Sequence, residues 1–252
     1  MSEAVLHYWV ALGVIAAGAA TFLGLLAVTA PYGRHARAGW GPALTSRTAW
    51  LLMETPAALG FAAVYAFGAR RAEAVPLVFL ALWELHYLQR AFVYPVLMRA
   101  PDKPVAAAIP AMGITFNVVN AWLNGRWVSH LGSYGVAWLA DPRFLAGAAL
   151  FLAGFVLNLR ADAALRALRA PGEQAYRIPR GGAFELVSCP NYAAELLEWI
   201  GWAVATWSLA GAAFAVYTAA NLVPRALAHH RWYRATFPDY PAGRKAIVPW
   251  LL

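Results

Sequence analysis

Residues 7–30 read HYWVALGVIAAGAATFLGLLAVTA, a stretch without a single Asp, Glu, Lys or Arg. A membrane-spanning helix needs about 20 mainly apolar residues to cross the hydrocarbon core of a bilayer. This stretch is long enough to do so. It is also too long for the apolar region of a secretory signal peptide, and we find no small-residue cleavage site after it. The segment predicts an integral membrane protein.

The composition of the whole chain agrees with this prediction. Of 252 residues, 62% are hydrophobic and only 13% are charged, whereas a soluble domain is closer to half apolar and about a quarter charged. Twelve Trp and eleven Tyr residues are typical of the aromatic belts at membrane interfaces. The formal charge is +8, but the basic residues stand between apolar segments, so we expect no nucleic-acid partner. The single cysteine, Cys189, excludes an intrachain disulfide.

Further apolar segments follow along the chain. A last apolar block, 192–227, is too long for one span, and the run Trp207-Ser208-Leu209-Ala210-Gly211 predicts a turn that divides it in two. We therefore predict an all-α integral membrane protein with about seven transmembrane helices in a single domain, residues 1–252. The other predicted spans lie near residues 48–68, 74–97, 105–123 and 144–159.

The distribution of Lys and Arg predicts the orientation. Basic residues accumulate in cytoplasmic loops, and here they are few in the loops near residues 70, 126 and 143 but many in the alternate loops, above all in residues 160–190. We expect the N-terminus outside and the C-terminus in the cytosol. The protein is predicted to be multi-pass, in a bacterial inner membrane or the endoplasmic-reticulum equivalent.

Polar residues within the predicted spans carry the functional information. Buried ionisable groups are costly in a membrane, so they either pair to hold helices together or mark a functional site. Here they gather mostly in the cytosolic halves of the helices. This pattern favours a polar cavity open to the cytosol, which suits an anionic, phosphate-bearing ligand. The residues are Glu54, Glu84, His86, Tyr87, Arg90, Asn117, Asn120, Asn124, Glu195, Glu198, Arg225, His229, His230, Arg231 and Tyr233.

Common metal and nucleotide motifs are missing from the sequence. His229 and His230 are adjacent, so on a helix they point about 100° apart and cannot easily share one ion. We find no His-x-x-x-His pair, no Gly-x-Gly-x-x-Gly turn and no P-loop. We expect no metal, and any dinucleotide must bind without a Rossmann domain.

Several runs at ungapped spacing resemble the steroid 5α-reductases, also called 3-oxo-5α-steroid 4-dehydrogenases. The resemblance is strongest in the C-terminal region, about residues 103–252, and shorter pieces match in the N-terminal half. Glu84 has no counterpart role in that family. The matching runs are 158–162, 165–173, 176–184, 187–188, 191–192, 195–201, 205–209, 225–226, 229–233 and 237–246, with 32–34, 49–56 and 86–94 in the N-terminal half.

The resemblance implies an NADPH-dependent oxidoreductase that reduces the 4,5 double bond of 3-oxo-4-ene steroids. Tyr87 and Glu54 are the implied catalytic residues. They would polarise the 3-oxo group while hydride reaches the β-carbon, with Glu54 holding a proton that it can donate. Water would then protonate the enolate. The resemblance further implies a lipophilic steroid that enters from the bilayer, and we expect a monomer.

Cofactor and substrate residues follow from the same resemblance. The implied cofactor-binding residues are Asn158, Asp162, Arg169, Tyr176, Arg177, Asn191, Glu195, Arg225, His229 and Tyr233, with Tyr32, Arg34 and Lys103 added from neighbouring loops. Candidate walls for the steroid are Trp50, Phe116 and Trp122.

Other functions stay open at this stage. A related membrane reductase acting on another sterol double bond or on an enoyl lipid fits the same motifs. A methyltransferase of the isoprenylcysteine carboxyl type favours Arg-His-Pro-x-Tyr, whereas residues 188–192 read Ser-Cys-Pro-Asn-Tyr. A transporter predicts internal repeats, and we find none.

Overall fold

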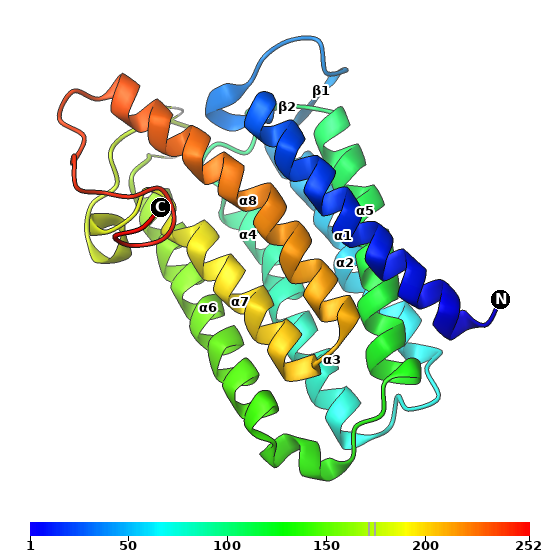
Figure 1. Ribbon diagram of the computed structural model, residues 1–252. Helices are drawn as coiled ribbons and strands as arrows, with labels where there is room; N and C mark the ends of the chain where they lie inside the picture. The colour runs from blue at the N-terminus through cyan, green and yellow to red at the C-terminus, as the bar shows by residue number, and fades with distance from the viewer. Residues whose placement is uncertain (171, 174) are drawn as a thin grey trace.

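The computed structural model describes residues 1–170, 172–173 and 175–252; Pro171, within one of the matching runs, and Gln174 lie outside them. Across these ranges the chain is a bundle of helices with one short β-ribbon (Figure 1). The helices are α1 (Glu3–Ala27), α2 (Ser46–Ala66), α3 (Ala74–Leu88), α4 (Tyr94–Leu97), α5 (Ala108–Arg126), α6 (Pro142–Ala167), α7 (Pro190–Thr206) and α8 (Leu209–Thr236). The strands β1 (Ala43–Thr45) and β2 (Pro104–Ala106) pair antiparallel.

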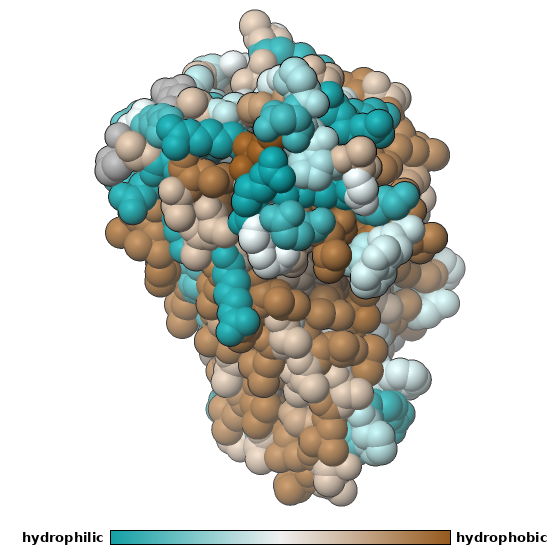
Figure 2. All heavy atoms as spheres, turned by 90° about the vertical axis from the view of Figure 1, so that its left-hand side faces the viewer, coloured by the Kyte–Doolittle hydropathy of each residue, from teal (hydrophilic) through white to brown (hydrophobic). Residues whose placement is uncertain are grey.

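Each predicted apolar segment is mainly helical; residues 105 and 106 of the span predicted at 105–123 belong to β2. The third, predicted over residues 74–97, consists of α3, a π-helical turn η2 (Gln89–Val93) and α4. Within the described ranges, three helices, α1, α2 and α6, are long and apolar enough to cross a membrane by length and composition. Figure 2 shows that hydrophilic residues cover one end of the molecule while the body below is mainly apolar. This division is consistent with a membrane protein whose polar end lies in water.

The helix ends follow local rules. Thr45 caps α2 by accepting a hydrogen bond from the Thr48 amide at 3.2 Å, and Asp141 caps α6 by accepting from the Arg143 amide at 2.8 Å. Between α7 and α8, Trp207 adopts φ 44° and ψ 47° and the Ser208 hydroxyl caps α8. The predicted turn at residues 207–211 is confirmed.

Small residues let α6 and α7 pack closely. A Cβ added at Gly154 on α6 would meet the backbone nitrogen of Glu198 at 2.5 Å and the backbone oxygen of Ala194 at 2.6 Å. Packing of this kind is common between membrane helices, where small residues let the backbones approach. It brings Asp162 on α6 and Glu195 on α7 to the same side of the bundle.

An aromatic core joins α2, α3 and α7. Trp83 stacks on Phe61 with ring centroids 4.3 Å apart and donates through its indole nitrogen to the Ala57 carbonyl at 2.9 Å. Trp199 and Trp202 on α7 complete the cluster, and all four rings are fully buried. Large rigid rings fix the distances between these helices, and Tyr87 lies at the edge of this frame.

The polar end is assembled from segments far apart in the sequence. The β-ribbon, the connection after α6 and the C-terminal tail lie at the same end of the bundle (Figure 1). Arg244 in the tail is buried; it donates to the Pro179 carbonyl at 2.8 Å and pairs with Glu185 at 3.2 Å. The tail therefore holds the connection after α6 in place.

Candidate active site

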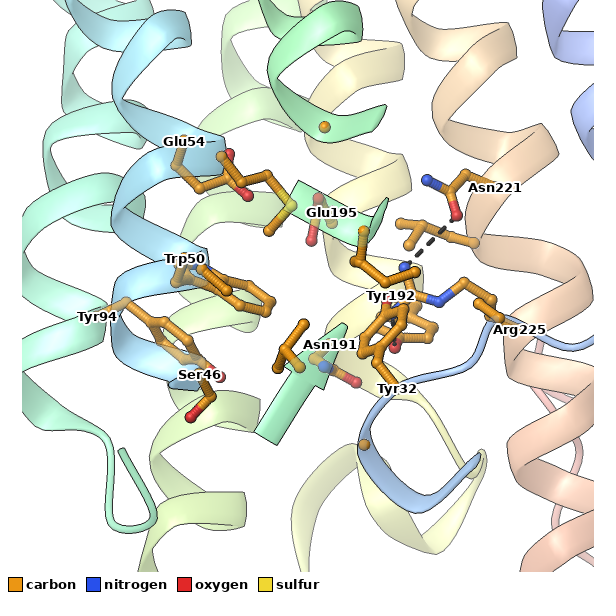
Figure 3. Close-up of a pocket in the computed structure, with 18 of the residues that line it drawn as sticks. Tyr32, Ser46, Trp50, Glu54, Tyr94, Asn191, Tyr192, Glu195, Asn221 and Arg225 are labelled. Atoms are coloured by element: carbon orange, nitrogen blue, oxygen red, sulfur yellow. Dashed lines mark hydrogen bonds between the residues drawn. The ribbon is translucent and has the colours of Figure 1, made fainter. Parts of the chain in front are cut away.

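A cavity of about 530 Å³ lies within the bundle and reaches its polar end. A drug-sized ligand typically occupies a pocket of about 300–1,000 Å³. Figure 3 shows side chains converging on it from several helices: Trp50 and Glu54 from α2 lie on one side, Asn221 and Arg225 from α8 on the other, and Asn191 and Glu195 come from α7. The cavity is the candidate active site.

Glu54 and Tyr87 both line this cavity, from α2 and α3 respectively. Oε2 of Glu54 accepts a hydrogen bond from the Asn117 amide at 3.4 Å, and the same amide donates to the Met53 carbonyl at 2.7 Å. The ring of Tyr87 packs on Trp83 and Trp199, with centroids 4.9 and 5.6 Å away. Two potential proton donors thus face one space from neighbouring helices.

Arg90 forms an ionic centre to which the sequence analysis gave no role. Its Nη1 donates to Oδ2 of Asp162 at 2.9 Å, and its Nη2 lies 3.6 Å from Oε2 of Glu195. Its guanidinium also lies over the rings of Trp50 and Tyr94, 5.0 and 4.7 Å from their centroids. Arg90 belongs to η2, and π-helical turns are frequent at functional sites. The signal available in the sequence was an arginine inside an apolar span.

A second buried pair lies beside Tyr87. Nδ1 of His86 is 2.8 Å from Oε1 of Glu198, and both side chains are buried. Oε2 of Glu198 has no hydrogen-bond partner within the described part of the chain. His86 lines the cavity.

Cationic side chains surround the polar end of the cavity. Lys103 donates to the Tyr176 hydroxyl at 2.6 Å. Arg34 lies over the rings of Tyr176 and Tyr233, 5.0 and 4.4 Å from their centroids. Its Nη1 is buried and makes no hydrogen bond to any residue that the structure describes. We call Arg34, Lys103, Arg169 and Arg225 the cationic end of the cavity; all four line it.

A histidine pair lies at the same end. Nε2 of His35 is 3.1 Å from Nδ1 of His229, and the rings are stacked. Burial, then the charges of Arg34 and Arg37, lower the pKa of His35, which lies in the connection between α1 and α2. A neutral His35 can share a hydrogen bond with His229, which ties that connection to α8.

The cavity brings together most of the predicted site residues. Besides Glu54 and Tyr87, it is lined by Tyr32, Arg34, Trp50, Lys103, Phe116, Asp162, Arg169, Tyr176, Arg177, Asn191, Glu195, Arg225, His229 and Tyr233.

Two predicted residues lie elsewhere. Asn158 does not line the cavity; its amide donates to the Asn191 carbonyl at 2.9 Å, so it supports the wall from behind. Trp122 also lies away from the cavity, and its ring faces His7 on α1 with centroids 5.5 Å apart. Six residues separate Trp122 from Phe116, which turns it about 240° around the α5 axis.

Several other cavity residues were not predicted from the sequence. Tyr192 accepts a hydrogen bond from Arg225 at 2.8 Å, and Asn221 accepts one from the same arginine at 3.5 Å (Figure 3). Tyr192 lay within a matching run, and Asn221 is one turn before Arg225 on α8. Among the described residues no group of three or more His, Cys, Asp or Glu side chains is suited to holding a metal ion.

Comparisons with known proteins point to one family. A family model described as 3-oxo-5-alpha-steroid 4-dehydrogenase matches residues 103–252. The chain is 42% identical over 241 residues to "3-oxo-5-alpha-steroid 4-dehydrogenase 1" of Bos taurus, covering 94% of this chain and 93% of the relative. It is 42% identical over 238 residues to "Steroid 5-alpha-reductase DET2" of Gossypium hirsutum, with 92% of each chain covered. The Homo sapiens 3-oxo-5-alpha-steroid 4-dehydrogenase 1 is 41% identical over 94% of this chain and 92% of its own.

Proposed function

The chain belongs to the 3-oxo-5-alpha-steroid 4-dehydrogenase family of oxidoreductases, and we propose that it reduces the 4,5 double bond of 3-oxo-4-ene steroids to 5α-steroids with NADPH. The observation that carries the proposal is the likeness along nearly the whole chain to proteins named for this reaction. The part of the chain that is similar to these proteins includes the helices that supply Glu54 and Tyr87. The geometry of the cavity adds support from the chemistry of its side chains.

Glu54 and Tyr87 are the proposed catalytic residues. Reduction at the β-carbon of a conjugated ketone moves negative charge onto the carbonyl oxygen, and a preorganised donor aimed at that oxygen lowers the barrier. The Tyr87 hydroxyl is one such donor, and a protonated Glu54 is a second. Both line one cavity, and the aromatic frame around Tyr87 keeps its ring in place.

The cationic end of the cavity fits a phosphate-bearing dinucleotide. When bound, NADPH supplies the hydride. Arg34, Lys103, Arg169 and Arg225 offer charge-assisted hydrogen bonds to phosphate oxygens. The buried Nη1 of Arg34, which has no partner among the described residues, is a donor that a ligand oxygen would satisfy. The rings of Tyr176 and Tyr233 at this end offer flat surfaces for a base. The other proposed cofactor residues are Tyr32, Asp162, Tyr176, Arg177, Asn191, Glu195, His229 and Tyr233, with Asn158 supporting Asn191.

The steroid is proposed to occupy the apolar part of the cavity, between Trp50 and Phe116, and to enter from the bilayer. Met112 on α5 lines the cavity and is 55% exposed. Leu25 on α1 also lines the cavity. These apolar side chains on α1 and α5 support lateral access for a lipophilic substrate. We further propose seven membrane spans, the N-terminus outside, and a monomeric enzyme.

Purified protein incubated with NADPH and a panel of 3-oxo-4-ene steroids tests the function. We expect NADPH consumption that depends on the steroid, and a product heavier by two hydrogens with 5α configuration. Consumption only with other conjugated sterols or enoyl lipids would instead assign a sibling reductase. Methyl transfer from S-adenosylmethionine in place of NADPH oxidation would reject the reductase proposal.

A further inference from the structure

His86 and Glu198 form a buried pair directly beside the proposed catalytic tyrosine. His86 precedes Tyr87 in α3, and the two rings meet edge to face with centroids 4.8 Å apart. The ring of Trp199 packs on His86 from the other side at 4.6 Å. The hydrogen bond of 2.8 Å from Nδ1 to Glu198 then fixes the imidazole. The proposed polarisation of the carbonyl uses only Tyr87 and Glu54, so it assigns no role to His86 and Glu198.

The surrounding charges favour a protonated imidazole. Arg90 forms ion pairs with both Asp162 and Glu195, with nitrogen–oxygen distances of 2.9 and 3.6 Å. Glu198, whose side chain is 0% exposed, has only His86 as a partner within the described residues. A buried carboxylate without a cation is strongly unfavourable. A protonated His86 supplies that cation, and the pair is then an imidazolium bound to a carboxylate.

Charged groups act on His86 from α2, from α7 and from its own segment. From α7, Glu195 and Glu198 act on His86, and on its own segment Arg90 does so with the opposite sign. Glu54 faces it from α2, and α6 contributes the apolar ring of Phe155, 6.5 Å away between centroids. With Glu54 protonated, the carboxylates of Asp162, Glu195 and Glu198 carry three negative charges. Arg90, Arg166 beside Asp162 and a protonated His86 carry three positive charges.

The second ring nitrogen of His86 is available to a substrate. His86 lines the cavity, Nδ1 is occupied by Glu198, and Nε2 makes no hydrogen bond to the residues that the structure describes. We propose that His86 donates the proton that the substrate takes up during reduction, and that Glu198 is the positioning residue that keeps this proton on His86. The inference rests on the proposed reductase function.

The chemistry balances with these groups. Once the β-carbon is reduced, the substrate is an enolate held by Tyr87 and Glu54, and its α-carbon needs one proton. The Nε2–H bond breaks, a C–H bond forms at the α-carbon, and the imidazole becomes neutral. Cytosolic water returns the proton through the cationic end of the cavity. A positioned general acid contributes about 10²–10⁴-fold to a rate.

His86→Gln tests the proposal through isotope effects. We expect kcat to fall about 100-fold, while KM for the steroid and Kd for NADPH stay within about threefold. Because proton delivery becomes slow, the effect of D₂O on kcat should grow, and the effect of deuterium at the transferred position of NADPH should shrink toward unity. Glu198→Gln should change both isotope effects in the same direction with a smaller loss of kcat. Unchanged isotope effects in His86→Gln, or a kcat within about twofold of the wild type, would overturn the proposal.

Glu84→Gln is the matched control. Glu84 lies two residues before His86 on α3 and also has a buried carboxyl oxygen without a partner among the described residues, but it does not line the cavity. We expect its kcat and isotope effects to match the wild type. A wild-type protein that is inactive on every steroid would count against the reductase function itself. An active wild-type protein together with a His86→Gln variant of unchanged kcat and isotope effects would count against the role of His86 alone.

Nuclear magnetic resonance gives a second readout that needs neither cofactor nor turnover. In the ¹⁵N-histidine-labelled protein without NADPH, the signal that disappears in His86→Gln identifies the His86 ring. Its ¹⁵N chemical shifts near neutral pH should be those of an imidazole protonated on both ring nitrogens. In Glu198→Gln the same ring should become neutral. A neutral His86 in the wild type would reject the proposal even if folding and activity were intact.

Discussion

At the scale of single residues, Tyr87 and Glu54 differ in how their surroundings hold them. The Tyr87 ring packs between Trp83 and Trp199, so its hydroxyl has little freedom. Glu54 is held by one long hydrogen bond of 3.4 Å from Asn117. A preorganised donor costs no reorganisation during reaction. Tyr87 is thus the more constrained of the two donors.

Tyr87→Phe removes only the hydroxyl and keeps the packing. We expect turnover to fall about 100-fold or more, the usual scale for one lost oxyanion donor, with NADPH affinity and melting temperature near the wild-type values. Glu54→Gln should be similarly impaired. The double variant should lose less than the product of the single losses, because both donors act on one oxygen. A Tyr87→Phe protein that is fully active but less stable would show that the hydroxyl serves folding alone.

Arg169 tests the cationic end of the cavity. Its guanidinium lies over the Tyr176 ring, 4.8 Å from the centroid, and it lines the cavity. Charge-assisted hydrogen bonds are worth about 1.5–3 kcal/mol, so Arg169→Ala should weaken NADPH binding at least about tenfold. Arg234→Ala is the control, since Arg234 is exposed on α8 and does not line the cavity. Equal affinities in the two variants, measured by fluorescence titration, would contradict the placement.

At the scale of elements, the close contact of α6 and α7 determines where the acidic residues stand. Gly154 lets the two backbones approach, and Asp162 and Glu195 are then near enough to share Arg90. The pairing of α6 with α7 therefore sets the geometry of the ionic centre.

Gly154→Ala should disturb this interface. Its Cβ would lie 2.5 Å from a backbone nitrogen of α7, and overpacking of this kind costs about 1–3 kcal/mol. We expect the melting temperature to fall by about 3–10 °C in tryptophan fluorescence. Gly13→Ala on α1 is the control, because no atom lies within 4 Å of its added Cβ. A melting temperature that falls equally in both variants would rule out the contact as the cause.

At the scale of the whole molecule, the polar end and the apolar body predict how the chain sits in a membrane (Figure 2). The cationic end of the cavity, the connection after α6 and the C-terminal tail belong to one end of the bundle. A soluble cofactor reaches that end only if it faces the cytosol.

Cysteine labelling tests the orientation. Arg180→Cys places a thiol in the connection after α6, and Phe67→Cys places one at an 83% exposed position after α2, near the opposite end. The native Cys189 is buried. We expect a membrane-impermeant reagent to label Arg180→Cys only from the cytosolic side and Phe67→Cys only from outside. The reverse pattern would overturn both the orientation and the access route of the cofactor.

The sequence by itself determined the helical segments, the turn at residues 207–211 and sixteen of the residues that line the cavity. Apolar runs and turn residues are local properties, so they can be read without knowing the packing, and the family resemblance supplied the site residues. Only the tertiary structure decided that Arg90 serves both Asp162 and Glu195, that His86 pairs with Glu198, and that Trp122 faces α1. These contacts depend on which face of each helix turns inward, and that is set by close packing between helices distant in the chain.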